Sequence, residues 1–255
     1  MPFEIVTIPC LEDNYAFLAH DPAMNVTMCI DVPEAAPIKA VLERRGWTLG
    51  HVLLTHHHAD HVQGLGALLA DHPAEVIGAA ADAHRLPPLD RAVTPGDEIA
   101  IGTQTGRVID VSGHTVGHIA VHFPSSRAVF TADSLMALGC GRLFEGTPEQ
   151  MWDSLSRLMA LPEETIVYSG HEYTAANAKF ALTVDPENPE LISRSRQIET
   201  ARSEGRPTIP STLAEELATN PFLRAADPDI RERLGLRDAP DAAVFAEIRA
   251  RKDAF

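Results

Sequence analysis

Apolar positions in the first two thirds of the chain fall in short runs rather than in long helical stretches. The runs are rich in β-branched and aromatic residues and are bounded by turn-forming residues, which is typical of buried strands. This pattern predicts strands at Glu4–Ile8, Tyr15–Ala19, Val26–Asp31, His51–Thr55, Glu75–Gly78, Asp97–Ile101, Gly106–Val111, His118–His122, Ala128–Thr131 and Thr165–Tyr168. Helical spacing of apolar residues predicts helices at Glu34–Arg45, Val62–Ala70 and Pro148–Leu161. Many short strands with few helices between them indicate two sheets covered by helices on the outside.

The pattern of apolar and polar residues changes after Glu172. From Thr174 to Phe255 strand patterns are rare, and helical periodicity recurs between breaks that contain proline. Ser211–Glu216 has the pattern of a helix start, with acidic residues in its first turn. The sequence therefore predicts two domains, residues 1–173 with the sheets and residues 174–255 as a small helical domain.

Composition and charge narrow the classes of protein to consider. The chain has 255 residues, of which 45% are apolar and 22% charged, as in ordinary globular proteins. The chain has no run of eighteen apolar residues, so no transmembrane helix is predicted. Its first residues do not resemble a secretory signal. The three cysteines are odd in number and widely spaced, which favours a reducing compartment and predicts a cytoplasmic protein.

The net charge of −15 argues against nucleic acid and anionic membranes as partners. A small anionic substrate stays compatible with this charge, because bound cations and a local basic cluster would reverse the potential at one site. The apolar pattern is accounted for by a core, and a monomer is expected.

The candidate chemistry is concentrated in Thr55–His61, Thr-His-His-His-Ala-Asp-His, between a predicted strand and a predicted helix. In extended chain His56 and His58 point to one side and His57 to the other. Asp60 and His61 follow as the backbone turns back. A polar loop rich in histidine and an adventitious metal site are the alternatives. Packed protonated imidazoles repel one another, however, and buried neutral ones each need a partner, so the cluster favours metal binding.

Three later strand ends carry similar residues: His114 and His171, each after a glycine, and Asp133. Each is weak evidence alone, since a histidine after a glycine is common in turns. Together with the first cluster they make a set of seven nitrogen and oxygen ligands: His56, His58, Asp60, His61, His114, Asp133 and His171. Seven ligands are too many for one tetrahedral ion and suit two ions that share a carboxylate. Imidazole and carboxylate ligands favour zinc, iron or manganese over softer metals.

Two further histidines, His118 and His122, lie in a strand pattern, and we expect them to support the ligands or to lie at the surface. His57 is expected to be a bystander.

The H-x-H-x-D-H order of His56 to His61, with the later Gly-His, Asp and Gly-His, resembles the signature of the metallo-β-lactamase superfamily. The resemblance implies an α/β fold, a four-layer αββα sandwich with a dinuclear metal site. It does not decide the reaction, because the superfamily includes hydrolases of several bonds and some oxidoreductases.

Narrower motifs resemble glyoxalase II, the hydroxyacylglutathione hydrolases. They occupy Leu138–Gly146, Gly170–Thr174, Pro210–Arg224 and Arg249–Phe255, and the likeness runs over the whole chain. It implies that His56, His58 and His114 hold one ion, that Asp60, His61 and His171 hold the other, and that Asp133 bridges them.

The same likeness implies glutathione contacts from Arg142, Tyr173, Arg249 and Lys252. Family members often have tyrosine where this chain has Phe144, so a phenol hydrogen bond worth about 1 kcal/mol is expected to be missing. Without the resemblance, Arg249 and Lys252 have a simpler explanation as basic residues that offset the dipole of a terminal helix.

The resemblance implies hydrolysis of S-D-lactoylglutathione to D-lactate and glutathione, the second step of methylglyoxal detoxification. A hydroxide between the ions attacks the thioester carbonyl, and Asp60 orients that metal-bound hydroxide. No serine or cysteine nucleophile is needed, and Cys140 is expected to be structural.

Three other functions are alternatives for this sequence. A persulfide dioxygenase of the same fold would use one iron ion and leave several of the seven ligands idle. A lactonase or β-lactamase would not explain the basic C-terminal segment. A non-catalytic metal-binding protein is disfavoured by ligands at four separate strand ends.

Overall fold

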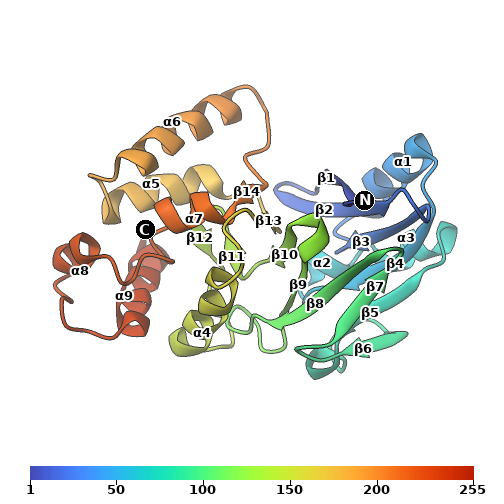
Figure 1. Ribbon diagram of the computed structural model, residues 1–255, viewed down its shortest axis with the longest axis horizontal. Coiled ribbons are helices and arrows are strands. Elements are labelled where there is room, and N and C mark those ends of the chain that lie inside the picture. Colours follow the sequence, from blue (N-terminus) through green and yellow to red (C-terminus); the bar gives the residue numbers. More distant parts are fainter. The chain divides into compact units, whose positions relative to one another are not determined.

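A computed structural model describes residues 1–255, which divide into two compact units (Figure 1). The first unit comprises Met1–Asp110 and Val116–Thr131, and the second comprises Val111–Thr115 and Ala132–Phe255. The predicted boundary between residues 173 and 174 stays a prediction. No helix is long and apolar enough to cross a membrane.

The first unit contains a six-stranded sheet in the order β1-β2-β3-β4-β5-β6. Its strands and the segments between them are β1 (Glu4–Cys10), β2 (Asn14–Asp21), β3 (Val26–Ile30), α1 (Ala35–Arg45), β4 (Leu49–Leu54), α2 (Ala59–Val62), α3 (Leu65–Asp71), β5 (Glu75–Ala79), η1 (Ala80–Asp82) and β6 (Arg91–Val93). β1 to β3 are antiparallel, whereas β3 to β6 run parallel and are joined by crossovers. The carboxyl ends of β3 and β4 therefore lie at one edge, where ligand sites in α/β proteins concentrate.

A second sheet of this unit contains, in spatial order, β7 (Glu98–Ile101), β8 (Gln104–Asp110), β9 (Ile119–Phe123) and β10 (Ala128–Ala132), with η2 (Pro124–Ser126) before β10. β9 and β10 are buried along their whole length. The two sheets pack through aromatic side chains, with Phe17 and Phe130 ring centroids 5.8 Å apart. Ile38 and Leu42 of α1 and Leu68 of α3 join the apolar cluster on the other face of the first sheet. The first unit therefore has helix, sheet and sheet layers.

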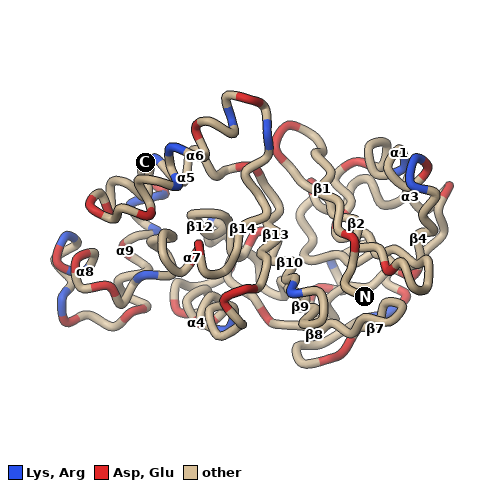
Figure 2. Tube along the Cα trace, turned by 45° about the horizontal axis from the view of Figure 1, so that its top comes forward, with Lys and Arg blue, Asp and Glu red and all other residues tan.

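The second unit is mostly helical. Its elements are β11 (Leu135–Met136), β12 (Gly139–Cys140), α4 (Pro148–Met159), β13 (Ile166–Ser169), α5 (Thr174–Val184), α6 (Pro189–Ser203), β14 (Ser211–Thr212), α7 (Leu213–Thr219), α8 (Pro228–Leu234) and α9 (Asp241–Ala254). Lys and Arg recur in α8 and α9, whereas Asp and Glu are spread along both units (Figure 2). Its core includes Phe180, Phe222 and Phe245, with neighbouring ring centroids 6.0 Å apart.

Local sequence explains where the helices of the second unit begin. Capping boxes start α4 at Thr147 and α7 at Thr212, and the side chains of Asn188 and Asp227 cap α6 and α8. Each cap satisfies backbone N–H groups that have no partner within the helix. The predicted helix start in Ser211–Glu216 is thus confirmed, one residue into the segment.

The predicted strands and helices are found with end shifts of a few residues. One predicted helix, Val62–Ala70, is wrong as a single element. Gly64 donates its N–H to the carbonyl of Val32, and the chain is divided there into α2 and α3. The predicted strand Val26–Asp31 ends one residue too late, because β3 stops at Ile30 and Asp31 has a left-handed φ of 56°.

Two buried histidines make stability depend on pH. Burial lowers the pKa of His20 and of His122 below the ordinary value of 6.5. The unfolded chain therefore binds these protons more readily, so their contribution is intact above pH 6.5 and is lost as pH falls through the folded pKa values. We expect the urea midpoint to fall on acidification below that pH. His122→Gln should reduce this fall, whereas His84→Gln at an exposed position should leave it unchanged; equal curves for wild type and His122→Gln would contradict the assignment.

Candidate metal centre

The histidine turn follows β4 and gathers three imidazoles within the first unit. His56 and His61 are fully buried, and their ring centroids lie 4.3 Å apart. The half-buried ring of His58 lies 4.7 Å from that of His56. His57 turns away, as the alternation predicted, and its Nδ1 lies 3.0 Å from a carboxylate oxygen of Asp82. His57 thus lies outside the predicted ligand set, as expected, and it anchors the turn to a fully buried acid.

A buried carboxylate that the sequence analysis missed orients two of these rings. Asp31 accepts hydrogen bonds from the backbone N–H and hydroxyl of Thr55, at 2.9 and 2.8 Å, and from Nδ1 of His61 at 2.8 Å. The Thr55 hydroxyl proton is used in that bond, so its oxygen accepts from Nδ1 of His56 at 3.0 Å. Both histidines thus carry their proton on Nδ1 and present the Nε2 lone pair, as metal-binding histidines do.

This geometry tests whether a cation fits in the first unit. Nε2 of His61 faces Oδ2 of Asp60 at 3.8 Å. Asn14 holds that carboxylate by donating to Oδ2 at 3.0 Å and to the Asp60 carbonyl at 3.1 Å. A nitrogen lone pair directed at a carboxylate oxygen is repulsive without a cation between them, so the residues fit a metal ion.

The second unit repeats the arrangement with the remaining predicted ligands. Asp133 follows β10 and His171 follows β13, and Oδ2 of Asp133 lies 3.4 Å from Nε2 of His114 and 3.3 Å from Nε2 of His171. All three residues are buried. Nδ1 of His114 donates to the carbonyl of Arg142 at 2.8 Å, which leaves the Nε2 lone pair directed at the carboxylate. This set also fits a cation.

Two further predicted residues pack on candidate ligands of the second unit. The ring of Phe144 lies 5.3 Å from that of His114, and the ring of Tyr173 stacks on that of His171 at 4.7 Å. Both Phe144 and Tyr173 are exposed, at 61% and 39%. They are therefore placed where a molecule approaching these ligands would meet them.

The basic residues differ in exposure. Arg142 is exposed, and its Nε lies 3.4 Å from Asp253. Arg249 is buried and donates to the carbonyl of Cys140 and to Asp253, each at 2.9 Å. Lys252 lies 5.3 Å from the centroid of the Phe180 ring, and burial, with the charge of Arg249, lowers its pKa. The predicted glutathione contacts of these residues stay predictions.

His122 of β9 and His118, the residue before this strand, are interior residues. His118 is fully buried and stacks on His56 with ring centroids 4.6 Å apart, and His122 is 8% exposed. The alternative of a surface position is therefore wrong for both, whereas a supporting position is correct for His118.

Cys140 is buried, and burial raises the pKa of its thiol to about 11. The thiol is protonated at neutral pH, which agrees with the expectation that it is not a nucleophile.

The fold and these histidine–carboxylate sets define a protein of the metallo-β-lactamase superfamily, whose family model matches residues 30–171. The crystal structure of the BLEG-1 B3 metallo-β-lactamase is similar in fold, with a TM-score of 0.68 and 21% identity over 86% of this chain and 99% of that one. ETHE1 from Myxococcus xanthus has a TM-score of 0.64 and 27% identity over 100% and 99% of the two chains.

A second family model, the hydroxyacylglutathione hydrolase C-terminus, matches residues 172–255. The hydroxyacylglutathione hydrolases of Roseobacter denitrificans and Ruegeria pomeroyi are 68% and 64% identical to this chain over 100% of both lengths. The chain belongs to the hydroxyacylglutathione hydrolase family. It is a thioester hydrolase, and the helical C-terminal match favours this function over the dioxygenase alternative.

Proposed function

We propose that the chain hydrolyses S-D-lactoylglutathione to D-lactate and glutathione at a centre of two divalent zinc ions. The observation that carries the proposal is the same in both units: an Nε2 lone pair faces a carboxylate oxygen, His61 toward Asp60 and His114 toward Asp133. That both sets of residues bind one dinuclear centre, with Asp133 as the bridging ligand, is taken from the family pattern. Nitrogen and oxygen ligands suit zinc, iron and manganese.

When bound, two divalent ions lower the pKa of a shared water and polarise the thioester carbonyl. The chain's own residues supply orientation. Asn14 fixes the carboxylate of Asp60, which we assign to orienting the attacking water. Asp31 holds His61, and through Thr55 also His56, so that each ring keeps one tautomer. The leaving group is a thiolate, whose low basicity removes the need for a dedicated acid.

The substrate side of the proposal concerns the tripeptide. Its two carboxylates would bind cationic side chains. Arg142 has an exposed guanidinium, and its backbone carbonyl accepts the hydrogen bond that orients His114. Phe144 and Tyr173 flank the ligands of the same unit. We also propose a cytoplasmic location, supported by three free and buried cysteines. A monomer stays a prediction.

The experiment that tests this function follows the loss of thioester absorbance. Metal-loaded protein is given S-D-lactoylglutathione, and an acetyl thioester without the tripeptide in parallel. Fast turnover of the glutathione ester alone supports the proposal. If both thioesters are cleaved equally slowly, glutathione is not the recognised part of the substrate. Oxygen consumption with glutathione persulfide would instead indicate a dioxygenase.

Arg249→Ala is expected to raise KM for S-D-lactoylglutathione by about tenfold and to lower kcat less, because it removes binding common to substrate and transition state. Arg251→Ala is the control, since Arg251 is exposed on the same helix and paired only with Glu247. An unchanged KM in Arg249→Ala would remove this residue from the substrate site.

Phe144→Tyr is expected to lower KM about fivefold, because a restored phenol hydrogen bond contributes about 1 kcal/mol. Steady-state kinetics on the glutathione thioester measure the effect. Phe144→Leu, which has neither ring nor hydroxyl, should not improve binding. A KM for Phe144→Tyr equal to that of wild type would mean that the hydroxyl has no partner on the substrate.

A further inference from the structure

The motif Pro210–Arg224 contains two polar residues to which the proposed chemistry gives no role. Glu216 lies in α7 and Asn220 ends it, and both side chains are fully buried. Neither can touch a substrate from there. Burial of a carboxylate and an amide is unfavourable unless each is paired, so their partners show what they hold in place.

Those partners belong to the β11–β12 hairpin. Four of its carbonyls and one N–H group bond to side chains of the helical region: Met136 O and Gly139 O to Asn220, at 3.1 and 3.0 Å; Ala137 O to Asn177, at 3.1 Å; Cys140 O to Arg249, at 2.9 Å; and Leu138 N–H to Glu216, at 2.9 Å. A pair of two-residue strands has little stability of its own. Leu138 also has a left-handed φ of 55°, which is strained for a leucine. The side chains therefore fix the shape of this hairpin.

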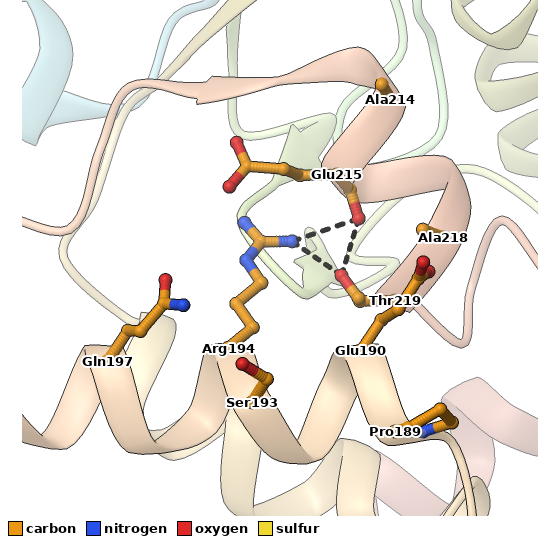
Figure 3. A pocket seen from close by; sticks show the side chains of 9 residues that line it. All are labelled: Pro189, Glu190, Ser193, Arg194, Gln197, Ala214, Glu215, Ala218 and Thr219. Atoms are coloured by element: carbon orange, nitrogen blue, oxygen red, sulfur yellow. Dashed lines mark hydrogen bonds between the residues drawn. The ribbon is translucent and has the colours of Figure 1, made fainter.

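Glu216 is itself held by a buried arginine. Arg194 of α6 lies 2.5 Å from Glu216 and donates to the hydroxyl of Thr219 at 2.7 Å. Figure 3 shows the guanidinium reaching from α6 to the Thr219 hydroxyl and the Glu215 carbonyl of α7, beside an open cavity of about 460 Å³. Hydrogen bonds to both of its oxygens fix the position of this buried carboxylate. One oxygen of Glu216 serves Arg194, and the other serves the hairpin and Asn220.

The hairpin leads directly to the metal ligands of its unit. Gly141 donates to the carbonyl of Ser134 at 3.1 Å, and a Cβ at this glycine would lie 1.9 Å from the carbonyl oxygen of Asp133. Arg142 follows, with its carbonyl bonded to His114 and its side chain exposed. A shift of the hairpin must therefore move Arg142.

We propose that Glu216 and Asn220 are positioning residues that hold the 136–140 hairpin, and through it Arg142, in the geometry that binds the glutathione part of the substrate. This inference rests on the proposed function. The helical region would then have a second role besides direct substrate contact. It would fix the conformation of the hairpin that precedes Arg142, a substrate-binding cation.

The test uses Asn220→Ala in the full-length, metal-loaded chain, with Asn188→Ala as its matched control. Asn188 caps α6 and bonds to the Ala218 carbonyl but makes no bond to the hairpin. Both variants are expected to unfold at lower temperature. Only Asn220→Ala should raise KM for S-D-lactoylglutathione, and the Kd of glutathione in calorimetry, by about tenfold. Only it should speed amide exchange at Leu138 and Gly141.

Equal KM and Kd values in the two variants, or unchanged exchange at Leu138 and Gly141, would overturn the inference. If Asn220→Ala does not fold, Glu216→Gln takes its place, because it keeps the shape and an acceptor oxygen while removing the charge. Wild-type protein without turnover of S-D-lactoylglutathione would instead refute the proposed function, and the exchange data would still decide whether the hairpin is held as described.

Discussion

Asp133→Ala is expected to lose bound metal and to lower kcat/KM by at least about a thousandfold, since a missing metal removes several kcal/mol of transition-state stabilisation. Asp133 is buried, with Nε2 atoms of His114 and His171 within 3.4 Å of one carboxylate oxygen. Without that carboxylate, the two imidazoles lose the anionic partner with which they would hold a cation. Metal content by atomic emission and thioester kinetics give the two readouts.

The control for this variant is Asp71→Ala, at an exposed carboxylate paired with Lys39. It should keep its metal and its kinetics. Full metal occupancy in Asp133→Ala would refute the bridging role. If this fully occupied variant also had low activity, Asp133 would act in the chemistry and not in metal binding.

Asp31→Ala is expected to weaken metal binding or activity by about 10- to 100-fold, the usual cost of losing a carboxylate behind a metal-binding histidine. The carboxylate fixes Nδ1 of His61 directly and that of His56 through Thr55, so both rings are freed at once. Competition with a chelator measures the affinity. Asp31→Asn should have a smaller effect, because its amide oxygen can still accept one of the bonds.

Asp82→Ala is the matched control for Asp31→Ala, because Asp82 is also fully buried and also bonded to a histidine of the turn, His57. His57 is not among the predicted ligands, so the loss of this pair should lower the melting temperature and leave metal affinity near that of wild type. Equal losses of affinity in Asp31→Ala and Asp82→Ala would reduce Asp31 to a general support of the turn.

Apolar runs predicted the strands that are long enough to form one, such as those that become β2 and β9. β6, β11, β12 and β14 were missed, because two or three residues do not make a recognisable run. The break in Val62–Ala70 depends on a tertiary hydrogen bond from Gly64 to Val32, which no local pattern contains.

The candidate ligand residues could be singled out from the sequence because they share one position, shortly after a buried strand. Asp31 follows β3 in the same way and was overlooked, although an acid after an apolar run was the signal used at Asp133. Asn14, which fixes Asp60, could not have been found, because its neighbours in sequence indicate only a turn. The burial of Arg249 was equally hidden, since helix spacing does not reveal what a guanidinium meets.

The division of the chain into two units also has a consequence for the order in which the protein forms during synthesis. Residues up to Thr131 supply the first unit except for Val111–Thr115, so that unit can fold while the rest is still being made. The excepted segment packs on α4: Gly113 lies against Met151, and Ser154 donates to the Ser112 carbonyl at 2.7 Å. His114 therefore takes its place only after residues 151–154 have left the ribosome, well after the histidines of the first cluster.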